Sequence, residues 1–596
     1  MFQKLILFKK IIGNKIFFAS VANFFLSIIA GLFEIIGIGL LAIFAISLSD
    51  TQIILSKIPL TDLKLYLASI EKYSLILLVA SAIIFAFILK HCITFLIFYF
   101  EIKILKKLTL KIKQQIFLSY LKEKYEYFLN NNKSEFINII SSQVGSFLTY
   151  IYNIFSIIKE SILVLIIFLS MLFINWKIVL AITIFLIILT FTFSKRFKQK
   201  LNSIGDRSRI LEEQEIKHLN ESYESIKFIK LGNKNNFFLD ILTKINSKKN
   251  RYEIIHFLIG KLPKIYLEIL VISSFMLLVL YLLKTYENTS SIFGLITFLA
   301  FSVIRIMPSF IVINNSYTNL SFFKSPFENV LNKTSKIISI KNNNKTANSN
   351  IKLEKISFNN VDFNFSGSKK NILKNLNFSL NLGDKLGIIG ASGSGKSTIL
   401  NNISGLLSPS KGQIYFNDQN INTNPEILVD KVSYVSQDCY LLDTNIKKNI
   451  AFAIKDEDID NDKIKRIIEI CNLSEFVNDL PNGLETIVGD KGSKISHGQR
   501  QRIGIARALY VNTEILMLDE SLNALDYQNE EVILKNIFKI HDKKFLILVS
   551  HRLESLKLCN KLMVLENGNI RDFGEKNEIL NRNVNLQKYF EKDETS

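Results

Sequence analysis

Proline, cysteine and tryptophan are scarce in this sequence: its 596 residues include seven prolines, four cysteines and one tryptophan. The cysteines lie far apart, and no two have the spacing of metal ligands; they are Cys92, Cys439, Cys471 and Cys559. Neither a disulfide framework nor a cysteine metal site is indicated, and we expect reduced thiols that face a cytoplasm.

Acidic residues are the minority charge, because 53 Asp and Glu stand against 73 Lys and Arg, for a formal net charge of +20. Such a chain suits either a nucleic acid or an acidic membrane surface. The lysines flank long apolar runs, and hydrophobic residues make up 48% of the chain. The placement of the charge therefore favours a lipid bilayer and argues against a nucleic-acid partner.

Six apolar runs in residues 1–331 are each near the roughly 20 residues that cross a bilayer as a helix. We expect these spans near residues 16–48, 73–100, 147–174, 177–194, 257–283 and 289–315. Only Asn175–Lys177 separates the third span from the fourth, which predicts a tight hairpin. The N-terminal "MFQKLILFKK" resembles the start of a signal peptide, but the apolar run behind it is too long and lacks a small-residue cleavage site. We expect an uncleaved helix at the membrane interface instead.

The lysine-rich loops after the second and fourth spans predict the orientation, because positively charged loops stay in the cytoplasm. Both termini are then cytoplasmic in a multi-pass protein. Apolar residues recur at helical spacing in these two loops, so we expect them to extend the membrane helices. The outer segment "IPLTDLKLYLASI" is predicted to form a small helix on the opposite face.

The composition changes after a polar segment, residues 332–350, that has the make-up of a linker. From residue 351 to 596, short apolar strands alternate with helices, as in an α/β domain. The predicted fold is thus an all-α membrane domain of six transmembrane helices with long cytoplasmic extensions, followed by an α/β nucleotide-binding domain with a phosphate-binding loop.

That loop is "GASGSGKST", Gly390 to Thr398, which matches G-x-x-x-x-G-K-[ST] between a strand and a helix. Glycines let the backbone approach phosphate oxygens, and the N–H groups at the helix start point at them. Lys396 is placed to reach the β- and γ-phosphates of ATP, and the Ser397 hydroxyl to bind Mg²⁺. Further along, the apolar "EILMLDE" ends in two carboxylates: Asp519 suits Mg²⁺, and Glu520 suits polarisation of the attacking water.

These two motifs occur in order with "VDFNF", "YVSQD", "ISHGQRQR", "NALD" and "VSHR". The set, from Leu353 to about Gly574, resembles the nucleotide-binding domain of ABC transporters. The resemblance implies a catalytic role for Glu520 and His551, and Mg²⁺ ligation by Ser397, Gln437 and Asp519. It implies an ATP site formed by Phe365, which would stack on adenine, with Gly390, Ala391, Ser392, Gly393, Ser394, Gly395, Lys396, Ser397, Thr398 and Gln437.

The same resemblance implies a second copy of the chain, because the family closes ATP between two nucleotide domains and this chain holds one. The signature residues Ser496, His497, Gly498 and Gln499 would contact the ATP held by the partner, and Asp526 would couple the two sites. His497 stands where the family usually has glycine, and Asp490, in "TIVGDKG", stands where it has glutamate. A simple homodimer that hydrolyses ATP with Mg²⁺ is expected.

Six spans before one nucleotide domain resemble half-transporter exporters of the type I class. A charge at the bilayer centre costs about 2.5–3.5 kcal/mol on insertion scales, so the presence of Glu34, Lys90, His91 and Arg305 within the spans must be explained. One explanation is structural: the Lys90 side chain reaches towards the membrane interface, and Glu34 pairs with a residue of another helix. Together, Glu34, Lys90 and Arg305 indicate a wet, partly cationic cavity that suits an anionic head group such as a pyrophosphate.

The membrane part is similar to the bacterial flippase for lipid-linked oligosaccharides of protein N-glycosylation, on "SYESIKFIKLGNKN", "PKIYLE", "VIRIMPS" and "SYTNLSFF". Lys90 departs from the arginine expected there, and an ammonium lacks the planar fork of a guanidinium. This similarity implies a lipid-linked glycan substrate in the bacterial inner membrane. Two alternatives remain: an exporter of peptides or amphipathic drugs, and an ATP-gated channel or regulator without cargo.

Overall fold

The computed structural model describes residues 14–49, 71–285, 289–340, 352–368, 370–423, 425–428 and 430–583. Contacts divide the chain into two units. The first comprises Met1–Glu123 and Asn130–Asn344, and the second comprises Lys124–Leu129 and Lys345–Ser596. The interfacial helix expected at the N-terminus and the small helix expected on the outer face lie outside the described residues.

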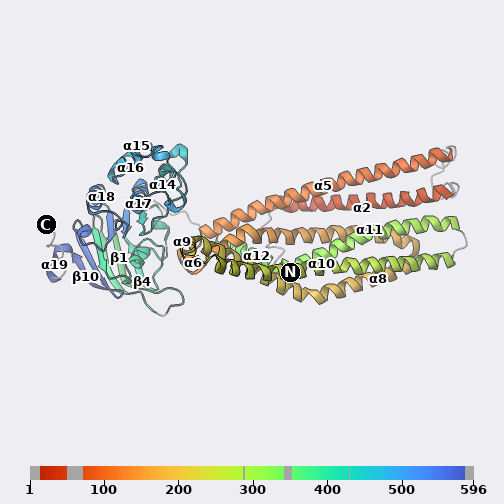
Figure 1. Ribbon diagram of the computed structural model, residues 1–596, viewed down its shortest axis with the longest axis horizontal. Helices are drawn as coiled ribbons and strands as arrows, with labels where there is room; N and C mark the ends of the chain where they lie inside the picture. The colour runs from red at the N-terminus through yellow and green to blue at the C-terminus, as the bar shows by residue number, and fades with distance from the viewer. Residues whose placement is uncertain are drawn as a thin grey trace. The chain divides into compact units, whose positions relative to one another are not determined.

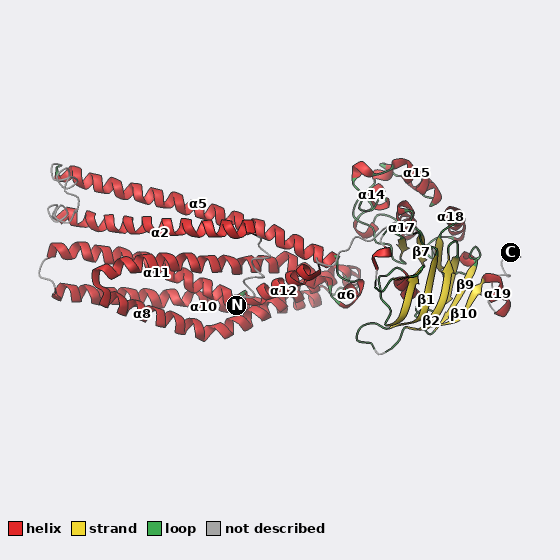
Figure 2. Ribbon diagram, turned by 180° about the vertical axis from the view of Figure 1, so that it is seen from behind, coloured by secondary structure: helices red, strands yellow, loops and turns green. Residues whose placement is uncertain are grey.

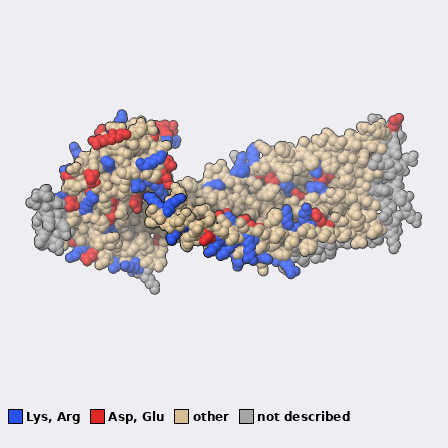
Figure 3. Space-filling model, viewed as in Figure 1, with Lys and Arg blue, Asp and Glu red and all other residues tan. Residues whose placement is uncertain are grey.

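The described part of the first unit is helical (Figure 1). Its elements are α2 (Asn14–Ser49), α5 (Lys72–Leu121), α7 (Lys133–Asn138), the π-helix Ile139–Gln143, α8 (Val144–Glu224), α9 (Ile226–Leu231), α10 (Asn235–Thr285), α11 (Thr289–Phe322) and α12 (Lys324–Ile340). Helix α6 (Tyr125–Asn130) lies almost wholly in the short segment that groups with the second unit. Among the described residues, four segments are long and apolar enough to cross a membrane: Phe18–Ala45, Tyr73–Leu121, Lys133–Leu172 and Ile296–Phe322. The expected spans 177–194 and 257–283 fall in α8 and α10, where many side chains lie outside the described set. In Figure 3, a broad part of the surface of the helical unit carries few charged side chains, while Lys and Arg gather in a few clusters elsewhere on it.

Helix α8 holds both the third and the fourth expected spans, and its helical pattern runs through Asn175–Lys177 without a break. Side-chain contacts nevertheless show that the chain doubles back. The Asn220 amide donates to Ser134 Oγ (3.4 Å), and Ser142 Oγ donates to Glu212 (2.6 Å). Both pairs are centred on residue 177, so the reversal lies at the tight connection that the sequence predicts.

Helix α12 corrects the expected linker, because residues 332–340 are helical. Val330 and Leu331 are buried with Leu108 and Ile112 of α5 in one apolar cluster. The Thr334 hydroxyl is also buried and bonds to backbone carbonyls one turn earlier. The helix thus starts before the segment, with a face that is buried at Val330 and Leu331, and it continues into residues whose polar composition predicted a linker.

Two sheets form the second unit (Figure 2). The six-stranded sheet has the order β10-β9-β3-β8-β7-β6, and the four-stranded sheet the order β2-β1-β4-β5. Its strands are β1 (Lys355–Phe363), β2 (Leu373–Asn381), β3 (Lys385–Gly390), β4 (Lys411–Phe416), β5 (Gln419–Asn420), β6 (Val432–Val435), β7 (Ile515–Asp519), β8 (Phe545–Val549), β9 (Lys561–Glu566) and β10 (Asn569–Glu575). Its α-helices are α13 (Lys396–Ile403), α14 (Ile446–Ile450), α15 (Asn461–Ile470), α16 (Ser474–Asn478), α17 (His497–Val511), α18 (Tyr527–Ile540) and α19 (Lys576–Arg582).

The centre of the larger sheet is parallel and buried on both faces. Strands β7, "ILMLD", and β8, "FLILV", have no exposed residue, as expected for strands covered on two sides. Successive side chains alternate between two apolar cores: Leu516 and Leu518 belong to one, Ile515 and Met517 to the other. The fold class predicted for this half of the chain is confirmed.

Gly205 lies at a close approach of α8 to α11. A Cβ at this position would lie 1.9 Å from the carbonyl oxygen of Phe322, a contact that requires the backbones to separate. We expect Gly205→Ala to lower the thermal unfolding midpoint of the detergent-solubilised protein by several degrees. Gly145→Ala is the matched control, because nothing lies within 4 Å of its Cβ and alanine favours a helix. Equal midpoints for the two variants would contradict this packing.

His541 predicts an acid-sensitive step in stability. It is 2% exposed, and burial, then the charges of Lys544 and Lys385, lower its pKa to about 4. Between about pH 6.5 and 4 the unfolded state therefore binds the proton that the folded state refuses, so stability falls as the pH falls through this window. We expect a loss of about 2 kcal/mol from pH 7 to pH 5, measured by denaturant unfolding. His541→Phe should flatten that slope, and an unchanged slope would rule out this origin.

Candidate functional site

The loop Gly390–Thr398 lies where the sequence predicts, between strand β3 and helix α13. Gly393 and Gly395 have φ values of +78° and +107°, a backbone region that favours glycine. Gly390 has no room for a side chain, since a Cβ there would lie 2.6 Å from the Leu565 carbonyl oxygen. The Ser394 hydroxyl is buried with no partner among the described residues. A tight backbone turn with an unpartnered hydroxyl at a helix start suits a phosphate group.

Lys396 is the cation of this loop, and its side chain is 5% exposed. Its Nζ donates to the carbonyl oxygens of Gly390 (2.9 Å) and Ala391 (3.3 Å), and lies 3.7 Å from Glu520 Oε1. Held in this way, the ammonium group lies within reach of a ligand in the loop.

Strand register brings Glu520 to His551. Asp519 of β7 pairs with Val549 of β8 in a parallel ladder, and the Glu520 N–H donates to the Val549 carbonyl oxygen (3.0 Å). Glu520 itself adopts a φ of +50°, an uncommon conformation for a side chain other than glycine. Its Oε1 lies 2.8 Å from His551 Nε2. Two residues that are 31 positions apart in the chain therefore face one point beside the phosphate loop, as expected for a base and its partner.

The groups expected to bind Mg²⁺ are oxygen donors of the kind that this ion prefers. Asp519 is 5% exposed, and its Oδ2 accepts a hydrogen bond from the Tyr434 hydroxyl (2.7 Å). Burial and the nearby Asp519 raise the pKa of Tyr434, so this hydroxyl stays a donor. Ser397 and Gln437 are exposed at the same edge of the sheet. One carboxylate, a hydroxyl and an amide fit an ion that takes its other ligands from phosphates and water.

Phe365, expected to stack on adenine, follows strand β1 and is half-buried, with its ring at 5.1 Å and 86° from Phe363. The next residue, Ser366, donates its N–H to Glu126 Oε1 (3.2 Å), and its hydroxyl also contacts that carboxylate. Glu126 belongs to α6, in the loop after the second span, and residues Lys124–Leu129 group with the nucleotide unit. Part of a predicted membrane-domain loop thus contacts the turn next to the predicted adenine site.

The expected signature residues form the N-terminus of α17. Ser496 and Gln499 make a reciprocal capping box: Ser496 Oγ accepts from the Gln499 N–H (3.2 Å), and Gln499 Oε1 accepts from the Ser496 N–H (2.9 Å). His497 is exposed, and Gly498 is half-buried. Asp526 caps α18, and hydrogen bonds from Asn529 lower its pKa. Each of these groups has a local structural role, and their contact with a partner's ATP stays a prediction.

Three side chains that hold this site could not be identified from the sequence. Tyr434, Gln501 and Arg552 lie inside the motifs "YVSQD", "ISHGQRQR" and "VSHR", yet only the structure shows their partners. Arg552 NH1 donates to the Leu525 carbonyl oxygen (3.0 Å) and to the buried Glu530. Gln501, 1% exposed, contacts two loops of the site. No sequence signal separates these residues from ordinary polar positions of a helix or strand end.

In the first unit, the three expected cavity residues meet. Glu34 of α2 is 4% exposed, and its two oxygens lie 2.6 Å from Lys90 Nζ of α5 and 2.8 Å from Arg305 Nε of α11. The pairing between helices anticipated for Glu34 is therefore present, and it involves both cations. The cluster carries two positive charges and one negative charge, so the cations are only partly neutralised.

Further charges lie within the spans and were overlooked, although the same rule for intramembrane charges would have found them. Lys159 of α8 lies 3.2 Å from the buried Glu101. Its neighbour Glu160 accepts a hydrogen bond from the fully buried Ser309 of α11 (2.7 Å). The interior of the membrane unit is thus more polar than its composition suggests.

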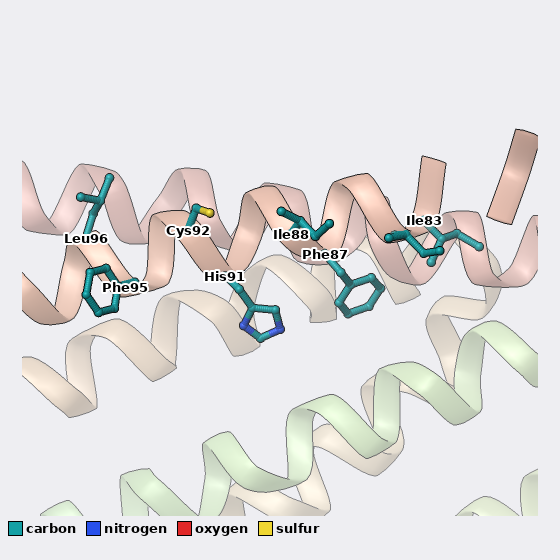
Figure 4. Close-up of a pocket in the computed structure, with 8 residues that line it drawn as sticks. Ile83, Phe87, Ile88, His91, Cys92, Phe95 and Leu96 are labelled. Carbon is teal, nitrogen blue, oxygen red and sulfur yellow. The ribbon is translucent and has the colours of Figure 1, made fainter. Parts of the chain in front are cut away.

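An apolar groove of about 790 Å³ runs along α5, close to the charged cluster. Figure 4 shows Phe87 and His91 projecting from the same side of the helix, with their rings 6.5 Å apart. Lys90 Nζ lies over the Phe87 ring, 5.3 Å from its centroid. A cationic centre therefore adjoins a surface that suits an apolar chain.

Comparisons with known proteins agree with both halves of this description. The family profile "ABC transporter" matches residues 373–523, and "ABC transporter transmembrane region" matches residues 20–309. A solved "bacterial Atm1-family ABC exporter with ATP bound" has the same fold, with a TM-score of 0.80, 19% identity and coverage of 98% of this chain and 99% of that one.

Among curated relatives, the leukotoxin translocation ATP-binding proteins LktB of Mannheimia haemolytica and Bibersteinia trehalosi are each 36% identical over 235 residues. These matches cover 39% of this chain and 33% of each relative. The chain therefore spans about a third of the length of these relatives.

The charged cluster predicts a large effect of Glu34→Gln. The variant leaves Lys90 and Arg305 as uncompensated cations, and breaking a buried ion pair costs about 3–5 kcal/mol. We expect a lower thermal unfolding midpoint in detergent, and partial recovery in Glu34→Gln with Lys90→Met, which removes one cation. Glu221→Gln is the control, because its pair with Lys217 is exposed. If Glu34→Gln and Glu221→Gln behave alike, the cluster does not stabilise the fold.

Proposed function

Because this chain carries both the transmembrane region and the nucleotide-binding domain of an ABC transporter, we propose that it is an ATP-driven exporter that works as a homodimer. Glu520 polarises the attacking water, and His551 orients that carboxylate and approaches the γ-phosphate. Lys396 binds the β- and γ-phosphates. Ser397, Asp519 and Gln437 would hold Mg²⁺, which would supply neutralisation of the phosphate charge. The contact between Glu520 and His551, 2.8 Å, is the observation that supports hydrolysis.

The position of α17 supports the proposed dimer. Ser496, His497 and Gly498 lie at a helix N-terminus, where N–H groups and the helix dipole favour an anion. We propose that they face the ATP of the second copy and close the site. ATP binding then favours the closed pair of nucleotide domains, and hydrolysis releases it, which alternates access to the membrane cavity. Glu126 on α6 supplies a contact through which closure reaches the helices.

For the cargo, we propose a lipid with an anionic head, such as a polyprenyl-pyrophosphate-linked oligosaccharide, flipped across a bacterial inner membrane with both termini in the cytoplasm. The supporting observation is the net positive cluster of Lys90, Arg305 and Glu34 beside the apolar groove on α5. A pyrophosphate would compete with Glu34 for the two cations, while the prenyl chain lies along Phe87 and its neighbours.

Export of peptides or proteins is the second candidate, and the names of the leukotoxin translocation relatives favour it. That function needs no cationic head-group site. A channel or regulator without cargo would share the ATP site, and only a flux measurement separates it from a transporter.

The test uses the full chain in liposomes, with ATP hydrolysis and lipid flipping measured in the presence of a polyprenyl-pyrophosphate glycan or a peptide. We expect the glycolipid to stimulate hydrolysis and to be flipped. The combined variant Glu34→Gln, Lys90→Met and Arg305→Met should weaken half-maximal stimulation by at least tenfold, because charge-assisted contacts are worth about 1.5–3 kcal/mol each. It leaves no unpaired charge in the cluster.

Lys217→Met with Glu221→Gln, an exposed pair, is the control for this variant. Stimulation by peptides alone would favour the second candidate. Hydrolysis with no flux of either cargo would favour a channel or regulator, and a variant as responsive as the wild type would exclude the charged cluster as the head-group site.

A further inference from the structure

Gln501 is a buried carboxamide between two loops of the ATP site. It lies on α17, three residues after Gly498, and is 1% exposed. Its Nε2 donates to the carbonyl oxygen of Gln437 (3.4 Å), and its Oε1 accepts from the N–H of Ala524 (3.1 Å). One side chain thus connects the signature helix, the Gln437 loop and the loop that runs from Glu520 to Asp526.

Only a side chain with both a donor and an acceptor can make these two contacts at once. A carboxylate offers acceptors alone, and a thioether of similar length offers no comparable donor or acceptor. Helix α17 also packs tightly against the Gln437 loop, which includes Cys439: a Cβ on Gly504 would lie 2.4 Å from Cys439 Sγ. Because no gap separates them there, we expect a shift of the Gln437 loop to move α17 and Gln501.

The loop at Ala524 is restrained from its other side by Arg552. The guanidinium donates to the carbonyl oxygens of Asn523 (3.3 Å) and Leu525 (3.0 Å), and it is held by Glu530, which is 3% exposed. The Ser555 hydroxyl bonds to the same carboxylate. Three consecutive residues, from Asn523 to Leu525, therefore each have a backbone group hydrogen-bonded to the side chain of Gln501 or Arg552.

We propose that Gln501 is a positioning residue that couples the Gln437 loop to the loop carrying Asp526, so that Mg²⁺-nucleotide binding at one site adjusts the segment facing the other. This inference rests on the proposed ATP hydrolysis. Gln501 is 1% exposed, and we expect it to act through the backbone of Gln437 and Ala524. A purely structural role would satisfy the same buried groups but would not affect the response to Mg²⁺.

The experiment measures ATP hydrolysis by the full chain in liposomes over a range of Mg²⁺ concentrations, with ATP affinity measured separately in the absence of Mg²⁺. Gln501→Met removes both hydrogen bonds at similar volume, and we expect kcat to fall about tenfold, as two net hydrogen bonds allow. The half-saturating Mg²⁺ concentration should rise at least threefold, while ATP affinity without Mg²⁺ stays unchanged. Gln501→Glu keeps the acceptor for Ala524 and loses the donor to Gln437, so it should show the same Mg²⁺ shift.

Gln143→Met is the matched control. Gln143 is also 1% exposed and accepts one hydrogen bond, from Asn329 (2.7 Å), in the membrane unit. It should lower thermal stability without moving the Mg²⁺ dependence. A Gln501→Met variant that loses kcat or stability with an unchanged Mg²⁺ midpoint would reduce Gln501 to a structural role, and a wild-type response in Gln501→Glu would remove Gln437 from the coupling. Absence of hydrolysis in the wild type would instead refute the proposed function.

Discussion

The carboxylate of Glu520 lies at the centre of the nucleotide site, 2.8 Å from His551 and 3.7 Å from the ammonium of Lys396. Strand register sets this arrangement, since β7 and β8 end together and the chain turns at Glu520 with a positive φ. One anion thus shares two hydrogen-bond donors at a place where a phosphate would compete for them. Binding of a triphosphate would draw Lys396 towards the ligand and leave Glu520 with His551, the pairing that a general base needs.

The membrane unit repeats this electrostatic arrangement with other residues. Glu34 holds Lys90 and Arg305 from two neighbouring helices, so α2, α5 and α11 meet at one buried carboxylate. A buried ion cluster is a poor source of stability but a good conditional contact, because breaking any one pair exposes an uncompensated charge. An anionic head group that replaced Glu34 would both satisfy the cations and free α2. The same charged side chains would then both bind the substrate and control the movement of α2.

Much of this architecture could be predicted from the sequence, for physical reasons. The phosphate loop must be glycine-rich to reach its backbone angles, so Gly390–Thr398 can be recognised from the sequence. Buried parallel strands must be apolar on both faces, and the apolar run of β7 can be recognised for that reason. Apolar length predicted six spans, and four segments of the described residues are long and apolar enough to cross a membrane. The midpoint of the Ser134–Asn220 contact agrees with the hairpin at Asn175–Lys177. Composition failed for residues 332–340, which are polar in composition yet continue helix α12. Gln501, Arg552 and Tyr434 could not be found from sequence, because their roles depend on partners 22 to 85 residues away in the chain that only the fold brings near.

The central claim is that two copies close on ATP, each completing the site of the other through α17. The direct measurement is the ATP retained by purified Glu520→Gln protein after free nucleotide is removed, with His497→Asp added in a second variant. An aspartate at the start of α17 suits the helix dipole but would repel a partner's triphosphate. The account predicts about one retained ATP per chain for Glu520→Gln and none for the double variant. Equal retention by both proteins, or rapid loss from Glu520→Gln, would contradict it.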